Sequence, residues 1–200
     1  MRVGVDFDNT IACYDDVFHR AALEGGLIPQ HVGISKGAVR DYLRNLGRED
    51  AWVELQGHVY GARFREAKLF PGVCEFFMRC RESAVAACII SHRTRYPAAG
   101  PRYDLHDAAH EWLETNGFQD IPAFLELTRE AKLNRICRER RSMFIDDLPE
   151  LFAEPSFPMG VERVLFDPYE LHAMPGVRVA KSWAEIESLT FCTAAAQIWT

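Results

Sequence analysis

The stretch GVDFDNTIACYD, residues 4–15, places two aspartates at the end of a short apolar run. Asp6 and Asp8 stand two residues apart, and Asn9 and Thr10 follow them. Burying an unpaired carboxylate is costly, so strands inside a core rarely carry one. The pattern therefore has two readings. Either the carboxylates mark the point where a strand leaves the core, or they hold a cation.

Short apolar runs of this kind recur along the chain and alternate with segments of helical periodicity. Strands that alternate with helices are typical of a parallel sheet whose two faces are both covered by helices. The sequence therefore predicts an α/β fold with a Rossmann-like sheet. The expected strands are residues 3–7, 84–90, 142–145, 163–166 and 177–180, and the expected helices between them are residues 73–81, 104–116 and 128–138.

One segment interrupts this alternation. Residues 15–69 show no convincing strand, and their pattern predicts three helices, at 16–24, 36–46 and 49–66. A helical insertion directly after the first strand is expected to form a small cap. The predicted organisation is a core formed by residues 1–14 and 70–200, with a helical cap at 15–69.

Composition limits the classes of function. The chain has 200 residues, of which 48% are hydrophobic and 26% charged, as is ordinary for a globular protein. Its formal net charge of -6 argues against nonspecific binding to nucleic acid, because there is no basic surplus to neutralise phosphates. The N-terminal residues lack the apolar region of a signal peptide, and no apolar run is long enough to span a membrane. We expect a cytoplasmic protein with no membrane partner.

The spacing of the cysteines in the sequence does not match that of a metal-binding site. None forms a C-x-x-C pair, and a chain of this length can build a core without disulfides. We expect them to be reduced and mostly buried. They are Cys13, Cys74, Cys80, Cys88, Cys137 and Cys192.

Polar residues end three of the predicted strands, and in a parallel sheet those ends share one edge, where ligands bind. Four carboxylates at one edge would repel each other unless a divalent cation were present, and an all-oxygen ligand set favours Mg²⁺. A carboxylate is ionised at neutral pH and can attack phosphorus, while a hydroxyl and a lysine can hold the phosphate oxygens. The residues concerned are Asp6, Asp8, Ser91, His92, Lys132, Asp146 and Asp147.

These residues resemble the four motifs of the haloacid dehalogenase (HAD) superfamily, in the same order. The motifs are DFDNT (6–10), IISHRT (89–94), the lysine of REAKLNRI (129–136) and FIDDLPE (144–150). The helical insertion resembles the C1-type cap of that superfamily. The resemblance covers nearly the whole chain.

The resemblance implies a role for each residue. Asp6 would be the nucleophile and a metal ligand, and Asp8 would be the general acid and base, with its backbone carbonyl on the metal. Of the two remaining metal-site residues, Asp147 would be the direct ligand, and Asp146 would lie behind the direct ligands or bind through water; the reverse assignment stays open. The phosphate-binding residues would be Asn9, Thr10, Ser91, His92 and Lys132.

The function expected from this resemblance is a Mg²⁺-dependent phosphatase that hydrolyses a small phosphomonoester through an aspartyl-phosphate. An aspartate at the position of Asp8 favours a phosphatase over a dehalogenase, because breaking a carbon–chlorine bond needs no protonated leaving group. The expected partner is a small phosphorylated metabolite, with a nucleotide as the first candidate and a sugar phosphate as the second. A phosphotransferase or phosphomutase and a non-catalytic binding protein remain as alternatives. A homodimer is left open.

Overall fold

The computed structural model describes residues 1–196, which form two compact units. We call them the sheet unit and the helical unit and describe each by itself. The sheet unit is made of Met1–Ile11, Leu69–His92 and the chain from Ile121 onward. The helical unit is made of Ala12–Lys68 and Arg93–Asp120. The role of residues 15–69 as a cap stays a prediction.

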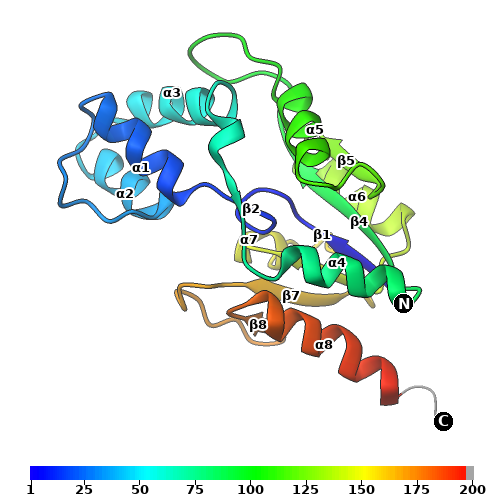
Figure 1. Cartoon of the computed structure of the whole chain (residues 1–200). Coiled ribbons are helices and arrows are strands. Elements are labelled where there is room, and N and C mark those ends of the chain that lie inside the picture. The colour runs from blue at the N-terminus through cyan, green and yellow to red at the C-terminus, as the bar shows by residue number, and fades with distance from the viewer. Residues whose placement is uncertain (197–200) are drawn as a thin grey trace. The chain divides into compact units, whose positions relative to one another are not determined.

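The sheet unit is built on six parallel strands in the order β5-β4-β1-β6-β7-β8 (Figure 1). The predicted α/β, Rossmann-like fold is confirmed, and all five expected strands are present. The sequence prediction missed β5. The strands are β1 (Arg2–Val5), β4 (Ala86–His92), β5 (Ala123–Glu126), β6 (Met143–Asp146), β7 (Glu162–Phe166) and β8 (Arg178–Ala180).

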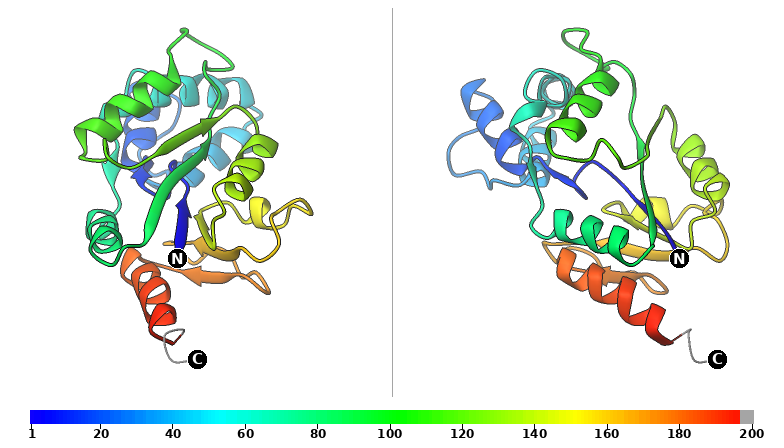
Figure 2. Two further views of the ribbon diagram at one scale, coloured as in Figure 1. Left: turned by 90° about the vertical axis from the view of Figure 1, so that its right-hand side faces the viewer. Right: turned by 45° about the vertical axis from the view of Figure 1, so that its right-hand side comes forward.

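Helices cover both faces of this sheet. Helices α4 (Val73–Glu82) and α8 (Trp183–Ala196) lie on one face, while α6 (Arg129–Arg138) and α7 (Pro149–Phe152) lie on the other (Figures 1 and 2). Because side chains alternate between the faces of a strand, every second residue of β4, β6 and β7 points toward α6 and α7. The core on that side contains Cys88, Ile90, Leu133, Ile136, Phe144, Leu151, Phe152, Phe157 and Leu165.

Two local features set the position of Lys132 and its surroundings. The Thr128 hydroxyl accepts a hydrogen bond from the Ala131 backbone N–H at 3.0 Å and caps the start of the helix, so Lys132 falls in its first turns. On β1, Gly4 leaves room for the Phe144 ring of β6, since a Cβ there would lie 2.6 Å from a ring carbon. The Lys132 ammonium lies 5.4 Å from the centre of that ring.

The helical unit packs three helices together and adds a fourth from later in the chain. The expected helix at 49–66 is two elements, because it breaks at Gly61, where a Cβ would overlap the Tyr103 ring. The elements are α1 (Asp15–Glu24), α2 (Lys36–Asn45), α3 (Glu49–Tyr60), the 3-10 helix η1 (Phe64–Glu66) and α5 (Leu105–Thr115). The short strands β2 (Ala12–Cys13) and β3 (Lys68–Leu69) pair with each other.

Helix α5 belongs to the helical unit through specific contacts. The Trp112 indole N–H donates to the Ala67 carbonyl at 3.0 Å, and its ring lies 5.9 Å from the Phe64 ring. The connection before α5 packs against Gly57, where a Cβ would come within 2.7 Å of the Ala99 carbonyl oxygen. The helical unit therefore contains the segment after β4 as well as the segment after β1.

The described cysteines form no disulfide. Cys80 and Cys88 are buried, whereas Cys13 and Cys74 are half-buried and Cys137 is exposed. The expectation that the cysteines are mostly buried was therefore wrong for the described ones. The side chain of Cys192 lies outside the described part of the chain. Within the described residues, every helix is too short or too polar to cross a membrane.

Candidate active site

The carboxyl edge of the sheet brings together residues that are far apart in the sequence. In β1, Val5 pairs with Ile89 of β4 on one side and Ile145 of β6 on the other. Asp6 directly follows Val5, and its N–H donates to the Ile145 carbonyl at 2.8 Å. Asp6, Ser91 and Asp146 therefore lie at the carboxyl ends of three adjacent strands, at the same edge of the sheet, as predicted from the sequence.

A buried lysine joins two of these acids. Asp6 and Asp146 lie in alternation with Gly4 and Phe144, so their side chains point toward α6. The Lys132 ammonium donates to Asp6 Oδ1 at 2.5 Å and to Asp146 Oδ2 at 2.6 Å. The Lys132 side chain is only 2% exposed. It is a bridging cation rather than a solvated helix residue.

The electrostatics of this group follow from its burial. Burial alone would lower the pKa of Lys132, but the charges of Asp146 and Asp6 outweigh it and leave that pKa raised. The pKa of Asp6 is raised to about 7, chiefly by burial and also by the charges of Asp146 and Asp8, while Lys132 opposes this rise. One lysine therefore does not balance the negative charge of this edge, and a further cation would stabilise it.

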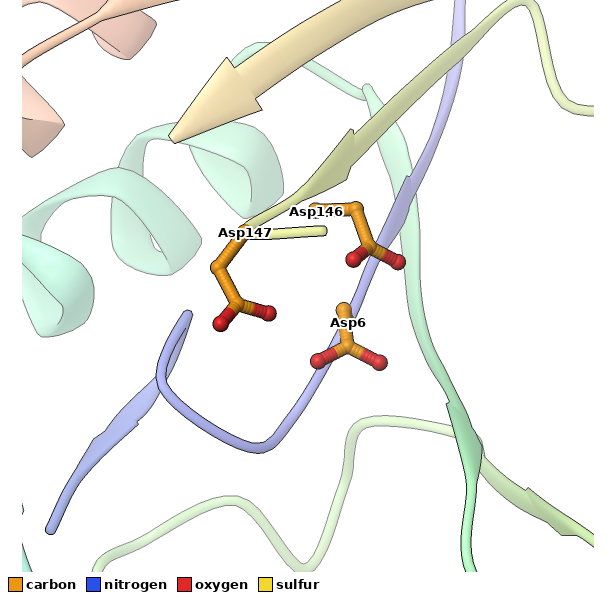
Figure 3. A group of neighbouring side chains, drawn as sticks. All are labelled: Asp6, Asp146 and Asp147. Carbon is orange, nitrogen blue, oxygen red and sulfur yellow. The ribbon is translucent and has the colours of Figure 1, made fainter. Parts of the chain in front are cut away.

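The same edge offers a set of oxygen ligands. Asp6, Asp146 and Asp147 each present a carboxylate oxygen, and these atoms all lie within 4.8 Å of one another (Figure 3). Opposite ligands of an octahedral Mg²⁺ are about 4.2 Å apart, so small side-chain movements would let one ion bind them. Asp146 is already engaged at both oxygens, since Oδ1 accepts the Leu148 N–H at 2.9 Å. The all-carboxylate set fits a hard divalent cation.

The loop after β1 carries the other predicted residues of the first motif. Asp8 is half-buried, and Asn9 has a positive φ of 57°, a conformation that asparagine tolerates better than most residues. The Thr10 carbonyl accepts the Trp183 indole N–H at 3.1 Å, which ties the loop to α8. The Thr10 hydroxyl is buried and has no hydrogen-bond partner among the described residues. The phosphate-binding roles of Asn9 and Thr10 stay predictions.

At the end of β4, Ser91 is buried and His92 is exposed. Ser91 occupies the strand next to Asp6, where a hydroxyl can reach a group bound at the edge. The roles of both residues toward phosphate stay predictions.

The strand-end argument could have found one more buried carboxylate. Asp167 directly follows β7, is buried, and accepts the His172 N–H at 2.7 Å, so it closes the loop between them. It is not a member of the carboxylate group formed by Asp6, Asp146 and Asp147. The Trp183 contact with the Thr10 carbonyl joins residues 173 positions apart and has no sequence signal, whereas the Leu148 N–H reaches Asp146 only two residues earlier.

Solved structures with the same fold cover nearly the whole chain. A HAD-superfamily hydrolase from Ehrlichia chaffeensis has a TM-score of 0.59 at 13% identity, over 97% of each chain. A HAD family hydrolase from Deinococcus radiodurans, solved with phosphate and sodium, has a TM-score of 0.58 at 14% identity, over 96% of each chain. An L-2-haloacid dehalogenase has a TM-score of 0.58 at 12% identity, over 94% of this chain and 97% of that one.

At such low sequence identity, these similarities show the fold. They confirm the resemblance to HAD-superfamily proteins, inferred from the four motifs, as a resemblance in fold. No family model matches the chain, and no curated protein matches its sequence. The chain thus has the fold of the HAD-superfamily hydrolases, and its chemistry must be argued from its own site.

Proposed function

We propose that this chain is a metal-dependent phosphatase that hydrolyses a small phosphomonoester, with Asp6 as the nucleophile. The observation that carries the proposal is the group at the carboxyl edge, where Lys132 bridges Asp6 and Asp146 while Asp147 offers a third carboxylate. Such a group combines an anionic nucleophile with the positive charge that an anionic phosphate requires.

Two carboxylates would have separate roles in the reaction. One oxygen of Asp6 attacks phosphorus, and the bond to the leaving oxygen breaks, which forms an aspartyl-phosphate. Lys132 and the Ser91 hydroxyl hold the phosphoryl oxygens and offset their charge. Asp8 donates a proton to the leaving oxygen and then takes one from the water that hydrolyses the intermediate.

The proposed metal is Mg²⁺, held by Asp6, Asp147 and the backbone carbonyl of Asp8. When bound, it would neutralise the carboxylates and polarise the phosphoryl group. Asp146 is proposed to act through water, because Lys132 and Leu148 already engage its two oxygens. Its carboxylate would then mainly orient Lys132.

Two features favour a phosphatase over a dehalogenase, although the solved structures with this fold include both a HAD phosphatase and an L-2-haloacid dehalogenase. Asp8 supplies a proton donor, which the loss of a halide does not need. The carboxylate group of Asp6, Asp146 and Asp147 suits a divalent cation, which a phosphate ester requires for charge neutralisation.

The test is hydrolysis of a panel of phosphate esters with Mg²⁺ and with excess chelator. We expect turnover with Mg²⁺ and its loss in chelator. An Asp6→Asn protein purified in the same way controls for contaminating phosphatases. Full activity in chelator, or equal activity of Asp6→Asn, would contradict the proposal.

A further inference from the structure

The loop that carries Asp8 lies in the sheet unit and is held at both of its ends. At its start, the Asp6 N–H donates to the Ile145 carbonyl of β6 at 2.8 Å. At its end, the Ile11 N–H donates to the Phe7 carbonyl at 3.0 Å and closes a turn around Asp8. The position of Asp8 therefore depends on how firmly the two ends of this turn are fixed.

Two further contacts fix the far end of the loop from outside it. The Ile11 carbonyl accepts the Phe70 N–H at 3.0 Å, and the Thr10 carbonyl accepts the Trp183 indole N–H at 3.1 Å. Thr10 and Ile11 are fully buried, so bulk water cannot replace a donor that is lost. Of these two donors, the indole belongs to a side chain and can be removed by a substitution that leaves the backbone unchanged.

The indole of Trp183 is itself fixed by packing within the sheet unit. Trp183 is 1% exposed, and its ring centre lies 5.0 Å from that of Phe76 in α4 and 6.0 Å from that of Phe166 in β7. Gly72, directly before α4, makes room for it, since a Cβ there would lie 2.8 Å from the Trp183 Cβ. An indole enclosed in this way points its N–H in one direction, so its hydrogen bond to the loop is well ordered.

This anchoring bears on the proton transfer, because a general acid must lie within hydrogen-bond reach of the leaving oxygen. A displacement of about 1 Å can cost about a hundredfold in rate. Asp8 is two residues from Thr10, so their Cα atoms are at most about 7 Å apart, and a shift of the Thr10 carbonyl reaches Asp8 through a short closed turn. Asp6 is fixed separately by β6 and should be affected less.

We propose that Trp183 is a positioning residue, whose indole N–H holds the loop so that Asp8 can protonate the leaving oxygen. Trp183 acts through the Thr10 carbonyl. The inference rests on the proposed function and gives α8 a part in it, although α8 lies outside the four motifs.

Two variants remove the indole N–H and keep an aromatic ring. Trp183→Phe is the simpler one, and benzothienylalanine at the same position keeps the bicyclic shape and replaces the N–H with sulfur. The test compares kcat/KM on p-nitrophenyl phosphate and on phenyl phosphate, which are similar in shape but differ in that phenolate is the poorer leaving group. We expect both variants to lower kcat/KM about tenfold on phenyl phosphate and no more than about twofold on p-nitrophenyl phosphate, because the poorer leaving group depends more on the proton.

Trp112→Phe is the matched control. Trp112 is 2% exposed, and its indole N–H also donates to a backbone carbonyl, that of Ala67 at 3.0 Å, but this bond lies in the helical unit. The variant removes the same kind of buried hydrogen bond and so controls for a general loss of stability. The ratio of kcat/KM on the two esters should keep its wild-type value.

Hydrogen exchange of the backbone amides, measured by NMR on the full chain without substrate, gives a readout that does not depend on turnover. In both Trp183 variants, the Ile11 amide should exchange about tenfold faster relative to the Asp6 amide, because the far end of the loop opens more often. In Trp112→Phe, the ratio of these two exchange rates should stay unchanged.

An equal loss on both esters, no loss on either, an unchanged exchange ratio of Ile11 to Asp6, or the same changes in Trp112→Phe would overturn the positioning role. If the wild-type chain turns over esters and the Trp183 variants match it, the positioning role alone is contradicted. If the wild-type chain hydrolyses no ester while Ile11 exchange rises in both Trp183 variants, the phosphatase is contradicted and the hold of Trp183 on the loop stands.

Discussion

Replacing Lys132 with methionine is expected to destabilise the metal-free protein by about 3–5 kcal/mol, the usual cost of breaking a buried ion pair by removing one partner. The figure applies here because the Lys132 side chain is only 2% exposed and contacts both Asp6, at 2.5 Å, and Asp146, at 2.6 Å. Methionine fills a similar volume, so the loss reflects charge rather than a cavity. The assay is urea unfolding followed by circular dichroism in excess chelator at neutral pH.

The matched control is Lys181→Met. Lys181 also pairs with one carboxylate, that of Glu170 at 2.7 Å, but its side chain is 54% exposed. Exposed pairs contribute about 0–1 kcal/mol, so this variant should change the free energy of unfolding by no more than that. The difference between the two variants isolates the effect of burial.

The same experiment with saturating Mg²⁺ tests whether the ion and Lys132 neutralise the same carboxylates. A cation bound to Asp6 and Asp147 would supply part of the missing charge, and ligand binding stabilises the folded state by mass action. We expect the stability deficit of Lys132→Met to shrink when Mg²⁺ is present. A deficit no larger than that of Lys181→Met, or one that Mg²⁺ leaves unchanged, would refute the reasoning.

Two further predictions concern the packing of the site. Gly4→Ala should lower the free energy of unfolding by about 1–3 kcal/mol in urea titration, because its Cβ would lie 2.6 Å from the buried Phe144 ring; an unchanged midpoint would contradict this. Thr10→Val should be neutral or stabilise the ligand-free protein by up to about 1 kcal/mol, since it removes a buried hydroxyl that has no partner in the described part of the chain. A clear loss of stability in the same titration would show that this hydroxyl has a partner.

The parts of the fold that could be predicted from sequence are those whose signal is local. Strands β1, β4 and β6 are short apolar runs that end in polar residues, and both properties can be read directly from the sequence. Because the carboxyl ends of parallel strands share one edge of a sheet, the sequence alone predicted that Asp6, Ser91 and Asp146 lie at one edge. Lys132 lies in a segment rich in charged residues, and only the packing of α6 shows that its side chain is buried between two acids.

The missed elements have weaker local signals. Strand β5 is an edge strand of the sheet, and its four residues are all half-buried. Its sequence, AFLE, is short and does not alternate strictly between apolar and polar residues. Helix α7 has four residues, too few to show a helical period. The membership of α5 in the helical unit depends on Trp112 reaching the Ala67 carbonyl, a contact between residues 45 positions apart.

The central claim is that Asp6 attacks phosphorus while Asp8 acts as the general acid and base. Mass spectrometry of an Asp8→Asn protein tests this claim most directly. Asparagine at position 8 keeps the nucleophile but cannot donate or accept the proton. With an ester whose leaving group needs little protonation, such as p-nitrophenyl phosphate, the first step should partly survive and the second should stall.

Rapid acid quench followed by intact-mass measurement should then show one added phosphoryl group, localised to the peptide that contains Asp6. The double variant Asp6→Asn, Asp8→Asn should show none. A phosphoryl group found on another peptide, or an Asp6→Asn protein that turns over at the wild-type rate, would contradict the account.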